Sequence, residues 1–112
     1  MDIVEERSGS FLVVKVAGSL DTTSFGKLES WFHTQFAAGE RRFVFDLSDL
    51  EYISSAGLRV FAVVLKKVRA ENGTLLLCSL RDQVKKVFDI AGFSAYFQFF
   101  PSLQEVLAAA ER

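Results

Sequence analysis

Short apolar runs alternate with longer segments of helical periodicity along this chain. The runs Phe11–Ala17, Arg42–Leu47 and Thr74–Cys78 are nearly continuous in hydrophobic residues, as is typical of strands that other structure covers. Helical spacing fills the intervals between them, and parallel strands need crossover connections of about this length. The alternation therefore predicts an α/β fold with a mixed, mostly parallel sheet.

Shorter elements complete the predicted order. Ile3–Glu6 precedes the turn Ser8-Gly9-Ser10 and predicts an edge strand that forms a hairpin with the first buried run. Ser102 and Glu105 have the spacing of a capping box for a final helix. The remaining elements are a helix from the possible caps Asp21–Ser24 to Gly39, helices over Gly57–Ala70 and Arg81–Ala91, and a last strand at Tyr96–Phe100. We expect a single domain over residues 1–112.

Composition excludes several classes of protein. Half of the 112 residues are hydrophobic, and 12 of them are Phe, so the chain can bury a core and is not disordered. Thirteen basic and 14 acidic side chains leave no excess of positive charge for nucleic acid. The chain lacks a run of about 20 apolar residues for a membrane span, and from its acidic, mixed start we expect no signal peptide. The lone Cys78 is interpreted as a buried strand residue. We expect a cytoplasmic protein with no nucleic-acid or membrane partner.

Two loops follow the carboxyl ends of predicted strands, where function gathers in sheets of this kind. One loop is Gly18–Thr22 and the other is Asp49–Leu58. A nucleophilic serine in Ser54-Ser55 would need a general base, but the single histidine, His33, lies in the first helix. GxSxG, Walker A and GxGxxG patterns are absent. We therefore expect no enzyme activity and no cofactor.

Four acids lie in or near these loops: Asp21, Asp46, Asp49 and Glu51. Carboxylates suit hard divalent cations, so a weak metal site is one interpretation. Their spacing matches no ordered calcium loop, which favours solvated loop acids and helix caps instead. The prediction is that the protein holds no metal.

The phase of the helix after Ser54-Ser55 separates the two serines. At about 100° per residue, one apolar stripe faces the sheet; its members are Leu58, Phe61, Leu65 and Val68. Phe61 and Leu65 are expected to be almost fully buried. Ser54 extrapolates to this stripe, whereas Ser55 falls on the exposed flank with Arg59 and Lys66, with Val63 alongside. Simple N-capping is one role for the pair. A phosphate on Ser55 would also be tolerated, because it would meet the open N–H groups of a helix start and Arg59 one turn on.

The segment Asp46–Val60, DLSDLEYISSAGLRV, resembles the signature of the STAS family, the sulfate transporter and anti-sigma factor antagonist domains. Gly18–Asp21 resembles the earlier G-x-L-D loop of that family, and Phe88–Phe93 resembles its later hydrophobic helix segment. The resemblance implies a four- to five-stranded sheet flanked by about four helices.

The resemblance also implies a function. Stand-alone members of this length are anti-sigma factor antagonists that bind a serine kinase anti-sigma factor until that kinase phosphorylates them. A metal-dependent serine phosphatase reverses the modification. Ser55 matches the modified serine, Ser54 stands where the family often has Asp, and Ala56 replaces a Ser or Thr. A subunit of a lipid-transport ATPase complex or of a larger signalling scaffold is the alternative within the family.

The helix phase and the resemblance together predict one surface for partner binding. Its residues are Asp21, Thr22, Thr23, Ser24, Ser54, Ser55, Gly57, Arg59, Val63 and Lys66.

Overall fold

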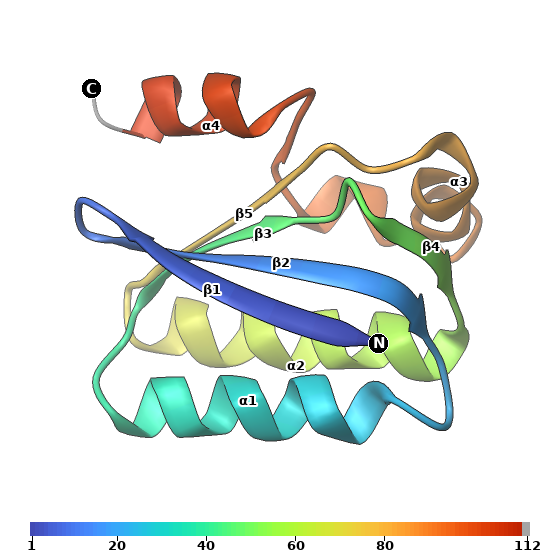
Figure 1. Ribbon diagram of the computed structural model, residues 1–112, viewed down its shortest axis with the longest axis horizontal. Helices are drawn as coiled ribbons and strands as arrows, with labels where there is room; N and C mark the ends of the chain where they lie inside the picture. The colour runs from blue at the N-terminus through green and yellow to red at the C-terminus, as the bar shows by residue number, and fades with distance from the viewer. Residues whose placement is uncertain (111–112) are drawn as a thin grey trace.

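The computed structural model describes residues 1–110, over which the chain forms six strands, four α-helices and one 3-10 helix (Figure 1). In chain order the elements are β1 (Asp2–Ser8), β2 (Phe11–Leu20), α1 (Phe25–Ala37), β3 (Arg42–Asp46), β4 (Leu50–Ile53), α2 (Ser55–Ala70), β5 (Thr74–Cys78), α3 (Asp82–Ile90), the 3-10 helix η1 (Ser94–Tyr96), β6 (Phe99–Phe100) and α4 (Leu103–Ala110).

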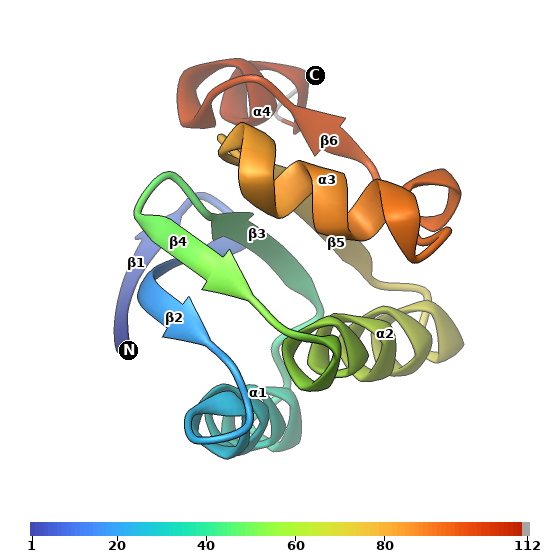
Figure 2. The same cartoon turned by 90° about the vertical axis from the view of Figure 1, so that its right-hand side faces the viewer.

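The strands form one mixed sheet in the order β1-β2-β3-β5-β6, with β4 paired to the far end of β2. Only the β1–β2 hairpin is antiparallel among the pairs of residues 1–110; the other pairs are parallel. Helices α1 and α2 cover one face, α4 covers the other, and α3 packs beside β4 (Figures 1 and 2). The predicted α/β class is confirmed. No helix within residues 1–110 is long and apolar enough to cross a membrane.

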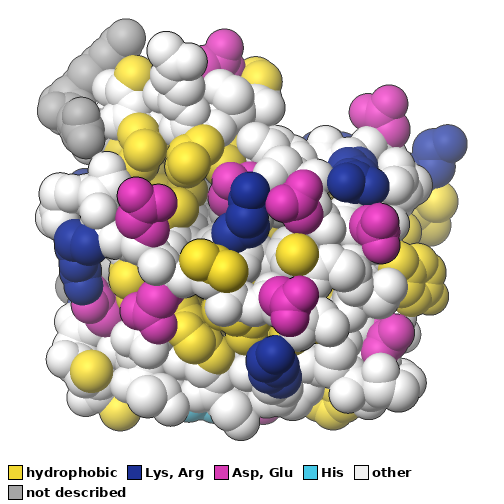
Figure 3. All heavy atoms as spheres, in the orientation of Figure 1, with side chains coloured by type: hydrophobic (Ala, Val, Ile, Leu, Met, Phe, Trp, Pro, Cys, Tyr) yellow, Lys and Arg dark blue, Asp and Glu magenta, His cyan; other side chains and the backbone are white. Residues whose placement is uncertain are grey.

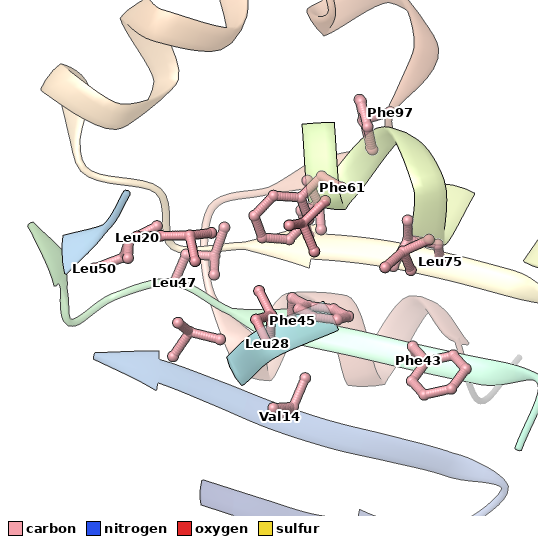
Figure 4. Close-up of a cluster of buried hydrophobic side chains, with 14 of the residues drawn as sticks. Val14, Leu20, Leu28, Phe43, Phe45, Leu47, Leu50, Phe61, Leu75 and Phe97 are labelled. Carbon is pink, nitrogen blue, oxygen red and sulfur yellow. The ribbon is translucent and has the colours of Figure 1, made fainter. Parts of the chain in front are cut away.

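The main core lies between the sheet and the pair α1 and α2, and aromatic rings connect its layers (Figure 4). Phe61 of α2 meets Phe45 of β3 edge-on at 5.3 Å between ring centroids and lies 5.8 Å from Phe88 of α3. Phe61 is fully buried, as its position on the apolar stripe predicts. Leu65 is only partly buried, so the prediction of nearly complete burial for it is wrong. It packs against the edge of the core, and the rest of its side chain lines a surface groove.

A smaller core lies on the opposite face of the sheet, under α4. Val106 of α4 is fully buried there, and Cys78 of β5 is buried as predicted. The Ser102 hydroxyl accepts a hydrogen bond from the Glu105 N–H at 3.1 Å, which is one of the two bonds of the predicted capping box. Figure 3 shows hydrophobic side chains beneath α4 and mixed acidic and basic side chains on the face that presents β1.

Strand β4 was expected to be loop. It is short, and its middle residues Glu51 and Tyr52 are both exposed, so it lacks the alternation that marks a half-buried strand. It forms because β2 continues three residues past Ala17, through an irregularity at Gly18/Ser19, and offers it a partner. At the other end of the chain, the strand predicted over Tyr96–Phe100 shortens to β6: Tyr96 is the last residue of η1, and Phe97 and Gln98 connect η1 to β6 outside any helix or strand.

Candidate functional site

The two loops singled out in the sequence lie side by side because strand β2 runs on to pair with β4. Gly18 has a φ of +95°, a conformation that favours glycine, and its N–H donates to the Asp49 carbonyl at 2.9 Å. Two residues later the Leu20 carbonyl accepts a hydrogen bond from the Ser54 N–H, also at 2.9 Å. The backbone of the first loop therefore fixes where helix α2 begins.

The start of α2 presses closely on this strand pair. Gly57 is buried, and a Cβ atom there would lie 2.7 Å from the Leu20 carbonyl oxygen and 2.8 Å from the Ile53 side chain. Only a residue without a side chain allows this approach. In the predicted binding surface, Gly57 thus contributes the position of the helix start.

Adjacent serines occupy different positions at this helix start. Ser54 is the N-cap: its backbone is extended, and its hydroxyl accepts from the Gly57 N–H at 3.4 Å. Ser55 is the first residue of α2 and is exposed. Among residues 1–110, no side-chain hydrogen bond involves the Ser55 hydroxyl. The outward direction predicted for Ser55 from the helix phase is confirmed.

A surface hollow of about 300 Å³ adjoins Ser55, and its lining is Ser55, Ala56 and Arg59. Arg59 is exposed and lies one helical turn beyond Ser55, on the same side of α2. The first turn of α2 contains no acidic side chain. The hollow therefore combines a hydroxyl, the open N–H groups of a helix start and a guanidinium, a set of groups that favours an anion.

The Asp21–Ser24 loop forms a closed turn. The Asp21 carboxylate accepts from the Thr23 N–H at 2.9 Å and from the Thr23 hydroxyl at 2.7 Å. These two bonds, with weaker ones from Ser24, hold the pKa of Asp21 below its ordinary value. Of the four possible caps in Asp21–Ser24, Ser24 is the N-cap residue of α1, but its side chain makes no cap bond. Its hydroxyl donates to the Ser19 carbonyl at 2.8 Å instead and ties the turn to β2.

The other three loop acids are also engaged in local contacts. Asp46 is buried and accepts from the Ser48 N–H at 3.1 Å. Asp49 pairs with Lys15 at 3.2 Å, and Glu51 lies 4.0 Å from Arg81. Residues 1–110 hold no group of three or more potential metal ligands. These carboxylates serve the structure of the loops and the strand ends.

The remaining predicted site residues extend away from Ser55. Thr22 and Thr23 are exposed on the turn beside the start of α2. Val63 is half-buried, and Lys66 is exposed about 16 Å along α2 from Ser55. The structure thus places Asp21–Ser24, Ser54, Ser55 and Arg59 together at one end of α2, whereas Val63 and Lys66 lie on its middle turns.

Sequence reasoning did not select two residues that shape this end of the molecule. Leu20 positions Ser54 through its backbone carbonyl, which no sequence pattern marks. Tyr52 of β4 is 52% exposed, two residues before Ser54. Tyr52 itself, an aromatic residue in a loop close to Ser54-Ser55, was the available signal, because exposed aromatic residues are enriched where proteins bind one another.

Comparison with known proteins supplies the family. The STAS domain model matches residues 2–106. BtrV of Bordetella bronchiseptica, which is named as an anti-sigma factor antagonist, is 38% identical, with 97% of this chain and 94% of BtrV covered. A solved structure from Thermotoga maritima, tm1081, with a name of the same kind, superposes with a TM-score of 0.93 at 18% identity, over 98% of this chain and 95% of that one.

The fold also matches solved structures of SpoIIAA in two chemical states. Unphosphorylated SpoIIAA superposes with a TM-score of 0.84 at 17% identity, covering 98% of this chain and 96% of that one. Phosphorylated Bacillus SpoIIAA superposes with a TM-score of 0.76 at 16% identity, covering 97% and 99%. At these identities the likeness shows the fold alone.

Proposed function

This chain belongs to the STAS domain family, and from that premise we propose that it is an anti-sigma factor antagonist switched by phosphorylation of Ser55. Unphosphorylated, it binds a serine kinase anti-sigma factor and so releases the sigma factor. When the kinase has phosphorylated this protein, the two dissociate. A metal-dependent serine phosphatase then removes the phosphate and restores the form that binds. The names of BtrV and of the SpoIIAA structures are in keeping with such a role.

One observation carries the proposal: of the two adjacent serines at the start of α2, one caps the helix and the other is exposed. Ser54 is committed to the cap, whereas the exposed Ser55 hydroxyl faces a hollow that a kinase active site can reach. A phosphoryl group at Ser55 would add a charge of about −1.5 to −2. The helix dipole and Arg59 would accommodate that charge without unfolding the helix.

The same charge explains the loss of binding. A dianion at the centre of a protein contact desolvates badly against apolar surface and repels carboxylates of the partner, including those of a kinase active site. A penalty of about 2–3 kcal/mol changes the dissociation constant by roughly 30- to 150-fold, which is enough for exchange between partners. Nothing in this scheme requires the fold to change.

The experiment uses the kinase recovered with the wild-type protein from its native host, together with ATP. Phosphopeptide mapping should place phosphate on Ser55 in the wild type and in Ser54→Ala, and on neither serine in Ser55→Ala. Calorimetry should show that Ser55→Ala binds the kinase persistently and that Ser55→Asp binds weakly, both remaining folded. Phosphate on Ser54, or undiminished binding by the phosphorylated protein, contradicts the proposal.

The proposed binding surface extends from the Asp21–Ser24 turn over Ser55 and Arg59 to Val63 and Lys66. Val63→Glu should weaken association with the kinase while thermal unfolding stays close to that of the wild type, because Val63 is only partly buried. If the variant melts early and binds normally, Val63 serves the packing of α2 and lies outside the surface.

A further inference from the structure

A second hollow lies farther along α2, on the flank away from α1. It has a volume of about 340 Å³. Its lining comes from two segments: Ala62, Leu65, Lys66 and Arg69 of α2, and Phe93, Tyr96 and Phe97 of the connection between α3 and β6. Figure 2 shows that connection on the same side of the molecule as α2. The hollow is a groove distinct from the one at Ser55, with which it shares no lining residue.

The groove is held in shape before any partner arrives. The Arg69 guanidinium donates to the Tyr96 carbonyl at 3.1 Å and ties the connection to the helix. The Phe93 and Phe97 rings stack with 6.4 Å between centroids, and Phe97 meets the buried Phe88 edge-on at 5.5 Å. The aromatic wall is thus anchored in the core, while Tyr96 itself is 60% exposed.

Its rim is basic on one side and uncharged on the other. Helix α2 carries Arg59, Lys66, Lys67 and Arg69 and no acidic residue, and residues 91–98 carry no charge. Glu71 follows only after the helix ends, and Asp89 before the connection is paired with Lys85 at 2.8 Å. An apolar floor beneath two cationic side chains complements a segment with apolar residues on one face and carboxylates beside them.

We propose that this groove docks an acidic amphipathic helix of a partner protein, with an apolar side chain seated against Phe93 and Phe97 and its carboxylates on Lys66 and Arg69. The inference rests on the proposed function only for the identity of that partner, the anti-sigma factor. Because the groove lies along the same helix as Ser55, a partner held there remains near the phosphorylation site. Because the groove is separate from Ser55, the kinase could stay bound there while it phosphorylates this protein.

The test titrates the full-length protein with a fluorescein-labelled peptide of about 15 residues, leucines at helical spacing on one face and glutamates on the other. Binding is followed by anisotropy, and amide NMR shifts map the site. We expect saturable binding with shifts at Ala62, Phe93 and Tyr96. Binding should weaken from low to high salt, because the charges at the rim are screened.

Three variants make the test specific. Lys66→Glu reverses a charge at the rim, and Ala62→Trp fills the floor without changing charge; each should weaken binding by about tenfold or more. Lys67→Glu is the matched control: the same charge change at an exposed neighbour that does not line the groove should leave the affinity near that of the wild type. Melting curves show that each variant is folded.

Several results overturn the inference. The first is absence of saturable peptide binding, and the second is an equal loss of peptide affinity in Lys67→Glu and Lys66→Glu. The third is amide shifts confined to other surfaces. The fourth is shifts at the groove that depend on protein concentration in the absence of peptide, which would assign the groove to a second copy of the chain. Ser55→Asp separates this inference from the proposed function. This variant should bind the peptide as well as the wild type does. The kinase experiment and the peptide experiment can therefore fail independently of each other.

Discussion

At the scale of single residues, the site depends on how closely the start of α2 approaches the ends of β2 and β4. Gly57 sits at the point of contact, and the Leu20 carbonyl is the nearest atom that an added Cβ would meet. A backbone oxygen cannot rotate away as the end of a flexible side chain can. The position of Ser55 therefore depends on a residue that contributes no side chain.

Gly57→Ala should destabilise the protein by about 1–3 kcal/mol through overpacking and should displace the first turn of α2. Gly26→Ala in α1 is the matched control, because a Cβ there would have no atom within 4 Å. Removing a helical glycine at that open position should be neutral or stabilising by up to about 1 kcal/mol. Urea unfolding measures the free energy of unfolding of both variants. Equal changes in the two would mean that the start of α2 can shift to accommodate a Cβ atom at Gly57.

At the scale of secondary structure, α2 has three sides with different tasks. The first side packs on the sheet, and the second side carries the exposed Ser55 and Arg59. The third side, which includes Leu65, lines the groove between α2 and the connection from α3 to β6. Residues one turn apart on the same helix therefore differ in what they stabilise. The fully buried Phe61 connects β3 to α3, whereas the partly buried Leu65 keeps part of its surface at the groove.

Phe61→Ala should lower the free energy of unfolding by about 3–5 kcal/mol, the transfer term plus the cavity left behind. Leu65→Ala should cost less than about 2–3 kcal/mol, the low end for such truncations, because part of the side chain is already in contact with water. Chemical denaturation of both variants measures the difference. A cost below about 1 kcal/mol for Phe61→Ala would contradict the phase of α2.

At the scale of the whole molecule, Cys78 reports on global unfolding. It is the last residue of β5 and is fully buried in the smaller core beneath α4, and burial raises the pKa of its thiol to about 11. The folded protein thus favours the protonated, unreactive thiol. A thiol reagent at pH 8 should label Cys78 slowly in the native protein and rapidly in denaturant. Labelling of the native protein as fast as that of the unfolded chain would show that α4 does not cover the sheet.

The raised pKa also has a consequence for stability. The unfolded chain loses this proton near pH 9.0 and the folded protein only near 11, so the contribution of the neutral thiol is complete below 9.0 and is lost as pH rises toward 11. Urea midpoints should therefore fall more in the wild type than in Cys78→Ala between these pH values. Parallel declines would mean that other groups account for the whole effect.

Periodicity along the chain was enough to predict the α/β class, the buried runs and the outward direction of Ser55, because spacing at 2 or 3.6 residues is a local property. The segment Asp46–Val60 was enough for the family, since its residue types occur in a fixed order. Element ends such as that of β2 were less certain, because their backbone bonds depend on which neighbour is present.

Contacts between distant residues required the folded molecule. Strand β4 exists because β2 extends beyond Gly18 to meet it, and the bond between Leu20 and Ser54 joins two loops that no pattern links. The partial burial of Leu65 and the groove lined by Arg69 and Tyr96 also come from contacts between segments that are distant in the sequence. Such features depend on how helices and crossovers pack across the sheet, and that packing is decided by the shapes of many side chains together.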